Sequence, residues 1–416
     1  MRRATRKVVC LALAAMILLT LTSVVSCGGE EEEEAGNKVI YGFEWDFTGR
    51  ASLGVTQTYD GIMAYLAMAE EENLLPEGLG VKVITYDTKS DPGRVPVGYL
   101  WLKGQGANLM SLAPHDMELM RSRAEEERMP FFNGSSMASL LDSEWLTFIY
   151  GPPESQLEIL LPWVTDNWDY ASEGRRPRIG AVTLAGVPFY EMQVAKAESI
   201  AAANPDKIEW AGAQKAPTTT MTWAAEISRL IDCDWIIAAI SGPSLASFTG
   251  QARAKGYDGR LIGPFESFWS FWELVRATTS KEDLDGVVTG SYFPWWTHTG
   301  SFISKLKQDV EEHCSQGEKE SVYLGTGRIT GWAMGIALVE IIRKAAENVG
   351  AENVDSEALR DAMFQVEVTV EGWGNVWKPE PGMNLFAKAV TIHEYEANQD
   401  EWVNIAGWAI PPSLGG

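Results

Sequence analysis

A high content of aromatic side chains is the most distinctive feature of this 416-residue sequence, which contains 17 tryptophans. Aromatic faces stack on flat ligands or hold cations, so the rings outside the core are candidates for recognising a small molecule. Most of the rings are expected to pack in the core, and a minority to contact a ligand. The best placed for contact follow predicted strands, and these are Trp45, Phe189, Tyr190, Tyr292 and Trp295.

Polar and charged residues lie near the same strand ends. Arg50 carries the planar guanidinium that can clamp a carboxylate with two hydrogen bonds, although a surface salt bridge is the commoner role for such an arginine. His115 and Asp116 could form a polar pair that faces a ligand, or a solvated dipeptide at the start of a helix. The sequence leaves both pairs of alternatives open.

The N-terminus has the pattern of an export signal. Four basic residues precede an apolar run at residues 8–21, which is short for a membrane span and has the length of a secretory signal. The following Val-Val-Ser-Cys resembles the bacterial lipobox, which implies that Cys27 becomes the lipid-modified first residue. An ordinary signal peptide is the alternative. Residues 1–26 are thus predicted to be a lipoprotein signal peptide, and residues 27–37 an extended acidic tether.

The composition argues against several classes of function. A net charge of −23 makes nucleic acid a poor partner, because phosphate binding needs a basic face. No CxxC or HExxH pattern is present and there are only four histidines, so neither a metal nor a cofactor is predicted. No GxSxG elbow, P-loop or dinucleotide fingerprint follows a suitable strand, which argues against an enzyme. Cys233 and Cys314 could pair as a disulfide outside the cytoplasm or remain two thiols.

Short apolar runs alternate with amphipathic stretches from residue 38 onward. Helical periodicity marks residues 59–69, 191–203, 223–231 and 329–349. Strands are expected at residues 39–43, 81–86, 109–112, 130–132, 146–150, 178–184, 235–240, 261–262, 286–292, 387–395 and 402–408. The alternation predicts an α/β protein of two doubly wound lobes, joined by a hinge with multiple crossovers. The first lobe is expected to comprise residues 38–153 plus 292–370, and the second residues 154–291 plus 371–416.

Short motifs follow the strands in a characteristic order. They are DFTGRASLG at residues 46–54, DTKSDP at 87–92, MPFFNGSS at 129–136, AKGY at 254–257 and LIG at 261–263. In this order and spacing they resemble the type I periplasmic binding proteins, specifically the group that binds branched-chain amino acids, amides and urea. The likeness covers essentially the whole mature chain and implies the periplasmic binding protein-like I fold.

The resemblance implies a ligand site in the cleft between the lobes. Ser135 and Ser136 match positions where hydroxyls and backbone amides receive a carboxylate or amide oxygen, although either serine could simply cap a helix. Glu266 matches an acidic position that pairs with a ligand ammonium, with a surface charge as the alternative. Three further cleft positions are implied, namely Ala113, Gly134 and Ser241.

The chain departs from the family where ligands are recognised. Asp46 occupies the usual proline position. Residues 113–116 read Ala-Pro-His-Asp, where the family usually has Gly-Pro and residues with small hydroxyl groups. The loop at residues 186–190 lacks the usual aspartate and Tyr-Gly pair. These differences indicate a ligand other than a plain aliphatic amino acid.

The function that the resemblance implies is capture of a small polar or aromatic ligand, such as an amino acid, amide or carboxylate, for an ABC importer. The protein is expected to be an exported monomer, attached to the membrane by its lipid only. Its lobes would close around the solute, and a permease would recognise the closed form. A ligand-sensing lipoprotein of the same fold is the alternative, and an enzyme is the third class.

Overall fold

The structure is a computed structural model in which residues 37–415 are described. The predicted signal peptide, the predicted lipidation site Cys27 and the predicted tether up to residue 36 lie outside the described residues. Between residues 37 and 415, no helix combines the length and the apolar character that a membrane span needs.

The first lobe is built on a six-stranded sheet with the order β11-β5-β4-β3-β1-β2. The pairs β1–β3, β3–β4, β4–β5 and β5–β11 are all parallel. Its strands are β1 (Asn37–Trp45), β2 (Leu79–Asp87), β3 (Leu109–Leu112), β4 (Phe131–Asn133), β5 (Leu146–Tyr150) and β11 (Leu385–Ala387). Its main helices are α2 (Ser52–Glu71), α3 (Val95–Gly104), α4 (Pro114–Glu126), α14 (Gly327–Val349) and α15 (Ser356–Met363).

The second lobe is built on a seven-stranded sheet with the order β13-β12-β10-β9-β8-β6-β7. Five strands run parallel, while β12 pairs antiparallel with both β10 and β13. Its strands are β6 (Arg178–Leu184), β7 (Glu209–Ala216), β8 (Trp235–Ala239), β9 (Arg260–Pro264), β10 (Val288–Ser291), β12 (Val390–Glu396) and β13 (Glu401–Ala409). Its main helices are α5 (Pro153–Asp166), α7 (Pro188–Ala203), α8 (Ala224–Leu230), α9 (Gly242–Ala254) and α11 (Trp272–Thr278).

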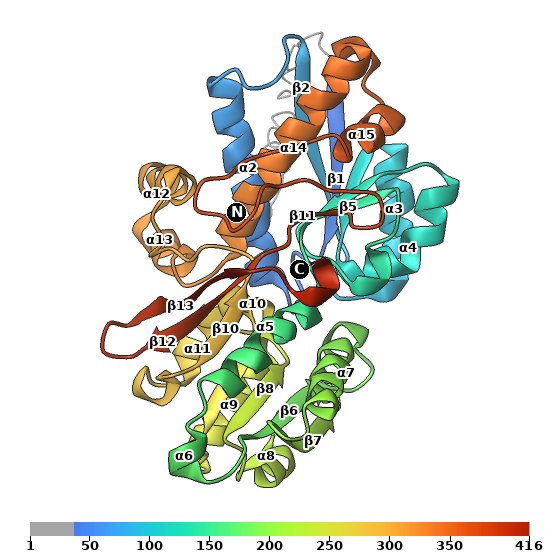
Figure 1. The fold of residues 1–416 in the computed structure, drawn as a ribbon. Helices are drawn as coiled ribbons and strands as arrows, with labels where there is room; N and C mark the ends of the chain where they lie inside the picture. Colours follow the sequence, from blue (N-terminus) through green and yellow to red (C-terminus); the bar gives the residue numbers. More distant parts are fainter. Residues whose placement is uncertain (1–36, 416) are drawn as a thin grey trace, which may run out of the picture. The chain divides into compact units, whose positions relative to one another are not determined.

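The chain passes between the two sheets three times, after β5, after β10 and after β11. The second passage leads through α12 (Ser301–His313) and α13 (Gln316–Val322) to α14. Figure 1 shows the orange α14 beside the blue α2, although the two helices lie far apart in the sequence. A Cβ atom at Gly61 of α2 would lie 2.6 Å from the carbonyl oxygen of Arg328 in α14, so this close helix contact requires glycine.

The assignment of residues 371–416 to the second lobe is wrong for the first part of this segment. The strand β11 pairs with β5 in the first sheet, so the chain enters the second lobe only between β11 and β12. The single strand expected at residues 387–395 is in fact split between two sheets, and no glycine or proline in this segment marks the break.

Buried strands are the elements that the sequence predicts best. β3, β5 and β6 begin and end at the predicted residues, and β5 and β8 are buried along their whole length. Continuous apolar runs of this kind are typical of parallel strands covered by helices on both faces. β7 was not predicted, because its sequence EWAGAQKA has no clear alternation and the strand lies partly exposed at the sheet edge.

Candidate functional site

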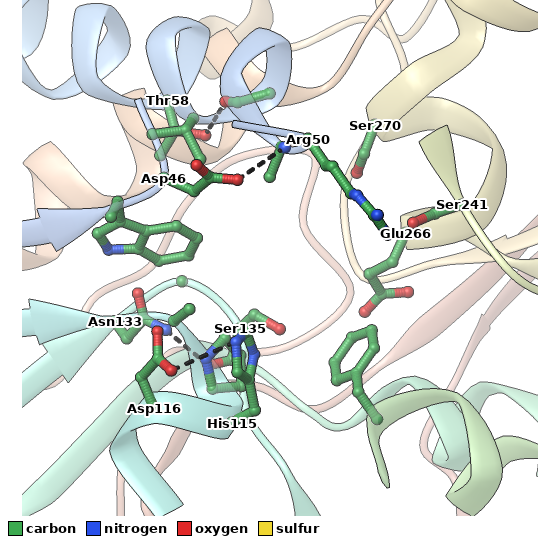
Figure 2. Close-up of a pocket in the computed structure, with 18 of the residues that line it drawn as sticks. Asp46, Arg50, Thr58, His115, Asp116, Asn133, Ser135, Ser241, Glu266 and Ser270 are labelled. Carbon is green, nitrogen blue, oxygen red and sulfur yellow. Dashed lines mark hydrogen bonds and ion pairs between the residues drawn. The ribbon is translucent and has the colours of Figure 1, made fainter. Parts of the chain in front are cut away.

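A cavity of about 350 Å³ lies where loops at the carboxyl ends of the parallel strands of both lobes meet. We call it the cleft cavity. Loops that follow β1 to β5 form its first-lobe wall, and loops that follow β6, β8 and β9 form its second-lobe wall. The first two turns of α14 complete the lining. Figure 2 shows side chains from both walls around the open space. Ligands of open α/β sheets bind at this edge of the strands.

The indole of Trp45 forms an aromatic surface at the end of β1. Its ring stacks on Phe43 with centroids 5.5 Å apart and an interplanar angle of 14°. Its Nε1 donates to the hydroxyl of Ser111 at 2.9 Å, and this hydroxyl donates to Asn133 Oδ1 at 2.9 Å. The amide of Asn133 then donates to the carbonyl oxygen of Ser135 at 3.0 Å. This chain of hydrogen bonds fixes the Trp45 ring relative to the loop that follows β4.

Acidic side chains stand on the same wall. Asp46 Oδ2 accepts hydrogen bonds from the backbone N–H of Ala51 at 3.1 Å and from the hydroxyl of Ser90. Asp46 Oδ1 is buried and has no hydrogen-bond partner in residues 37–415. Asp116 is buried in the first turn of α4, where its Oδ1 lies 3.3 Å from His115 Nε2. Burial raises the pKa of Asp116, His115 lowers it and Asp46 raises it, with a net rise above the ordinary value.

Glu266 contributes a buried carboxyl group to the opposite wall. It lies in the short helix α10 (Phe265–Phe268), directly after β9, and its side chain is only 8% exposed. Gln156 Nε2 donates to Glu266 Oε2 at 2.8 Å, while Gln156 Oε1 accepts from the backbone N–H of Phe265 at 3.1 Å. Glu266 Oε1 has no hydrogen-bond partner among the described residues. Burial raises the pKa of Glu266 to about 8.

The rest of the second-lobe wall is aromatic with a few hydroxyls. Phe189 and Tyr190 pack edge to face with ring centroids 5.6 Å apart at the start of α7. The hydroxyl of Tyr190 is hydrogen-bonded to that of Ser241. Arg50 reaches across from the first lobe, and its Nη1 donates to the carbonyl oxygen of Thr218 at 3.3 Å. A ligand would therefore meet flat apolar surfaces and hydrogen-bond acceptors on both sides.

A comparison with known families identifies this architecture. Residues 41–382 match the sequence model of the periplasmic binding protein family. The chain belongs to the periplasmic binding protein family. The family likeness and the two-lobed α/β fold expected from the sequence are thereby confirmed, and members of this family are solute-binding proteins rather than enzymes. No curated protein matches the chain.

Several solved structures share the fold of this periplasmic binding protein. A branched-chain amino acid ABC transporter protein from Thermus thermophilus with bound valine superposes with a TM-score of 0.77 at 15% identity, covering 91% of this chain and 98% of that chain. A fatty acid ABC transporter substrate-binding protein from Thermomonospora curvata gives 0.74 at 15% identity, with coverages of 91% and 94%. A leucine-binding protein from Thermotoga maritima gives 0.69 at 14% identity, with coverages of 90% and 100%.

Most of the residues singled out in the sequence lie on the wall of the cleft cavity. They are Trp45, Arg50, Ala113, His115, Gly134, Ser135, Phe189, Tyr190, Ser241 and Glu266. Ser135 is buried at the cavity wall, where its side chain interacts with the hydroxyl of Tyr150. Glycine at position 134 allows the loop after β4 to pack closely against α14, because a Cβ there would lie 3.0 Å from the methyl group of Thr330.

Three predicted site residues of this periplasmic binding protein lie elsewhere. Ser136 is fully buried and donates to the carbonyl oxygen of Tyr150 at 2.9 Å, so its hydroxyl is used within the protein. Tyr292 is also fully buried, and its hydroxyl donates to the carbonyl oxygen of Pro152 at 3.2 Å beside the first crossover. Trp295 packs against Trp269 with ring centroids 4.5 Å apart. Their structural contacts take these three side chains away from the cavity.

The cysteines do not form the disulfide that was one of the two alternatives. Cys233 and Cys314 are both free thiols. Cys233 lies beside Gly180 of β6 in the second lobe, whereas Cys314 directly follows α12 and lines a groove beside α2 and α14 of the first lobe. Across residues 37–415, no group of three or more His, Cys, Asp or Glu side chains could hold a metal ion.

Several wall residues were not singled out in the sequence. Asn133 ends the buried strand β4, and a polar residue at such a position is a usable signal. Thr326 and Thr330 reach the cavity from the start of α14, and no local pattern marks them. Their place depends on the packing of α14 against α2, which joins distant parts of the chain.

Proposed function

We propose that this protein captures a small amine-bearing solute in the cleft cavity and delivers it to an ABC importer. The observation that carries the proposal is the carboxyl group of Glu266, which is buried in the cavity wall with one oxygen unpartnered. No lysine, arginine or histidine of the described chain forms an ion pair with it. A buried carboxylate without a cation is costly, and a ligand ammonium would supply the missing charge.

The size and lining of the cavity support a small ligand. About 350 Å³ suits a molecule of amino-acid size, and pockets of this kind combine apolar walls with a few polar groups. Trp45, Phe189 and Tyr190 offer faces for the apolar part of the solute, and cation–π attraction would add to the binding of an amine.

The importer role is supported by the family and by the structures that share the fold. Substrate-binding proteins of ABC transporters are among these structures, including one with valine and one named for fatty acids. Arg50 of the first lobe already reaches the backbone of Thr218 in the second lobe. In the proposed mechanism the lobes close around the solute, and such bridging contacts favour the form that a permease recognises.

Membrane attachment through Cys27 is part of the same proposal. The Val-Val-Ser-Cys segment after the apolar run supports it. The full-length protein should fractionate with membranes, and Cys27→Ser should release it or leave its signal peptide uncleaved. A Cys27→Ser protein that has lost its signal peptide and still fractionates with membranes would contradict the anchor.

A thermal-shift screen of the purified protein tests the binding role. Because a ligand stabilises the state to which it binds, a matching amine should raise the melting temperature in a concentration-dependent way. The panel should contain amino acids, amines, amides and carboxylates. Glu266→Gln should abolish the shift given by amines. Glu154→Gln should retain it, because Glu154 is also buried but lies outside the cleft cavity, and its charge only raises the pKa of Glu266. Amine shifts that survive in Glu266→Gln would contradict the proposal.

A further inference from the structure

The first-lobe wall of the cleft cavity presents helix starts that already carry carboxylates. Asp46 Oδ2 accepts from Ala51 N–H just before α2, and Asp91 Oδ1 accepts from Gly93 N–H at 2.9 Å at the start of a short 3₁₀ turn (Pro92–Arg94). Asp116 lies in the first turn of α4. Helix N-termini attract anions through their free N–H groups and their dipole. The chain's own carboxylates occupy these places, so a ligand carboxylate would meet repulsion there.

The charges around the cavity are unbalanced. Four carboxyl groups line it, from Asp46, Asp91, Asp116 and Glu266, and the only basic side chains in the lining are Arg50 and His115. Arg50 is exposed and donates to a backbone carbonyl of the second lobe. His115 lies against Asp116. Neither basic group reaches Asp46 or Glu266 within ion-pair distance in the described structure.

Unpartnered acceptor atoms occur on both walls. Glu266 Oε1 belongs to a side chain that is 8% exposed, and Asp46 Oδ1 is likewise buried without a partner among the described atoms. Figure 2 shows Glu266 across the open space from Asp46 and Asp116. Buried acceptors are almost always satisfied in a folded protein, so these atoms call for donors from the ligand. The donors are needed at both ends of the cavity.

We propose that the ligand carries two cationic amine groups, one bound by Glu266 and the other by Asp46 and Asp116. The inference rests on the proposed function, because it concerns the same cavity, and it names the class of solute: a short diamine, or a larger molecule that holds two amines at such a spacing. Trp45 and Tyr190 would contact the apolar spacer. Since the two ammonium groups bind different lobes, the ligand itself would hold the lobes together.

Isothermal titration calorimetry with matched amines tests the inference. The probes are diaminoalkanes with three to six carbons and, for each, the monoamine of the same length. The best diamine is expected to bind at least about tenfold more tightly than its monoamine, since a second charge-assisted hydrogen-bonded pair is formed. Asp46→Asn and Asp116→Asn should reduce the affinity for the diamine to nearly that of the monoamine and leave the monoamine unchanged. Glu118→Gln is the control, because Glu118 lies exposed on the same helix as Asp116 and outside the cavity.

The outcomes separate this inference from the proposed function. If monoamines bind in a Glu266-dependent way and no diamine binds more tightly, the second cationic site is wrong and the proposed function stands. If norleucine binds as tightly as lysine, the cavity accepts an amino acid without a second cation, and the inference is again overturned. If no amine binds, both proposals fail. Should an aspartate variant not fold, the ratio of diamine to monoamine affinity in the unaltered protein decides the matter.

Discussion

Replacing Glu266 by glutamine separates the cost of burying this carboxyl group from its use in binding. The amide has nearly the same shape and can still accept the hydrogen bond that Gln156 Nε2 donates at 2.8 Å. It cannot carry a negative charge. We therefore expect Glu266→Gln to fold normally, to gain stability at alkaline pH in the absence of ligand, and to lose amine binding.

The direction and size of the stability change follow from the pKa of Glu266, which burial raises from 4.5 to about 8. The folded state holds this proton more tightly than the unfolded state. The stabilisation from Glu266 is therefore complete below pH 4.5 and is lost as the pH rises to about 8. Each pKa unit corresponds to about 1.4 kcal/mol, so the loss amounts to at most about 5 kcal/mol. Glu266→Gln has no proton to release and should avoid this loss.

Urea unfolding followed by tryptophan fluorescence at pH 4.5, 6.5 and 8.5 measures the effect. The free energy of unfolding of Glu266→Gln should match that of the unaltered protein at pH 4.5 and exceed it at pH 8.5. Glu154→Gln is a control whose stability change should occur in a different pH range, because burial raises the pKa of Glu154 only to about 7. Its gain should be smaller and should be complete at lower pH.

Ligand binding gives the complementary measurement. An ammonium ligand needs the ionised Glu266, so the affinity of the unaltered protein for an amine should rise about tenfold per pH unit below pH 8 and then level off. Parallel stability curves for the two proteins between pH 4.5 and 8.5 would refute the reasoning. So would an amine affinity that does not change with pH.

Three further substitutions test the packing that positions the site. Gly331→Ala should lower the free energy of unfolding by at least about 2 kcal/mol, because the methyl group would collide with the backbone of α2, and urea denaturation measures this loss. Asp309→Asn should cost about 3 kcal/mol in the same assay, since it leaves Arg328 buried after losing an ion pair of 2.7 Å. Trp45→Phe removes the hydrogen bond to Ser111 at 2.9 Å and should cost about 1 kcal/mol in thermal unfolding, with a several-fold loss of ligand affinity by calorimetry. Unchanged unfolding in any of these variants would contradict the corresponding contact.

The positions of several site residues could be predicted because they are local consequences of strand ends. Trp45 follows β1, Gly134 and Ser135 follow β4, and Glu266 follows β9. Carboxyl ends of parallel strands meet at one edge of a sheet, so buried apolar runs such as β5 indicate where a site must lie. The family motifs at residues 46–54 and 129–136 include the loops after β1 and β4.

Other features depended on contacts between distant segments. Tyr292 and Trp295 also follow a strand, but Trp295 packs against Trp269 and Trp402, which come from other parts of the second lobe. An aromatic side chain after a strand suits a ligand or a core equally well, so its type does not reveal its role. The split between β11 and β12 has the same origin, because the apolar pattern does not show which sheet offers a partner.

The sequence by itself determined the alternating α/β elements, the periplasmic binding protein family and the edge of the sheets at which a ligand would bind. The elements and the edge follow from apolar periodicity and turn chemistry, which act over a few residues. The family follows from the resemblance of motifs in a particular order along the chain. The tertiary structure decided which carboxyl groups are buried and left without a cation. Glu266 meets Gln156 across 110 residues of chain, and Asp46 meets Ser90 across 44. Burial and charge pairing depend on which remote segments meet, and therefore the ionic character of the cleft cavity became visible only in the folded chain.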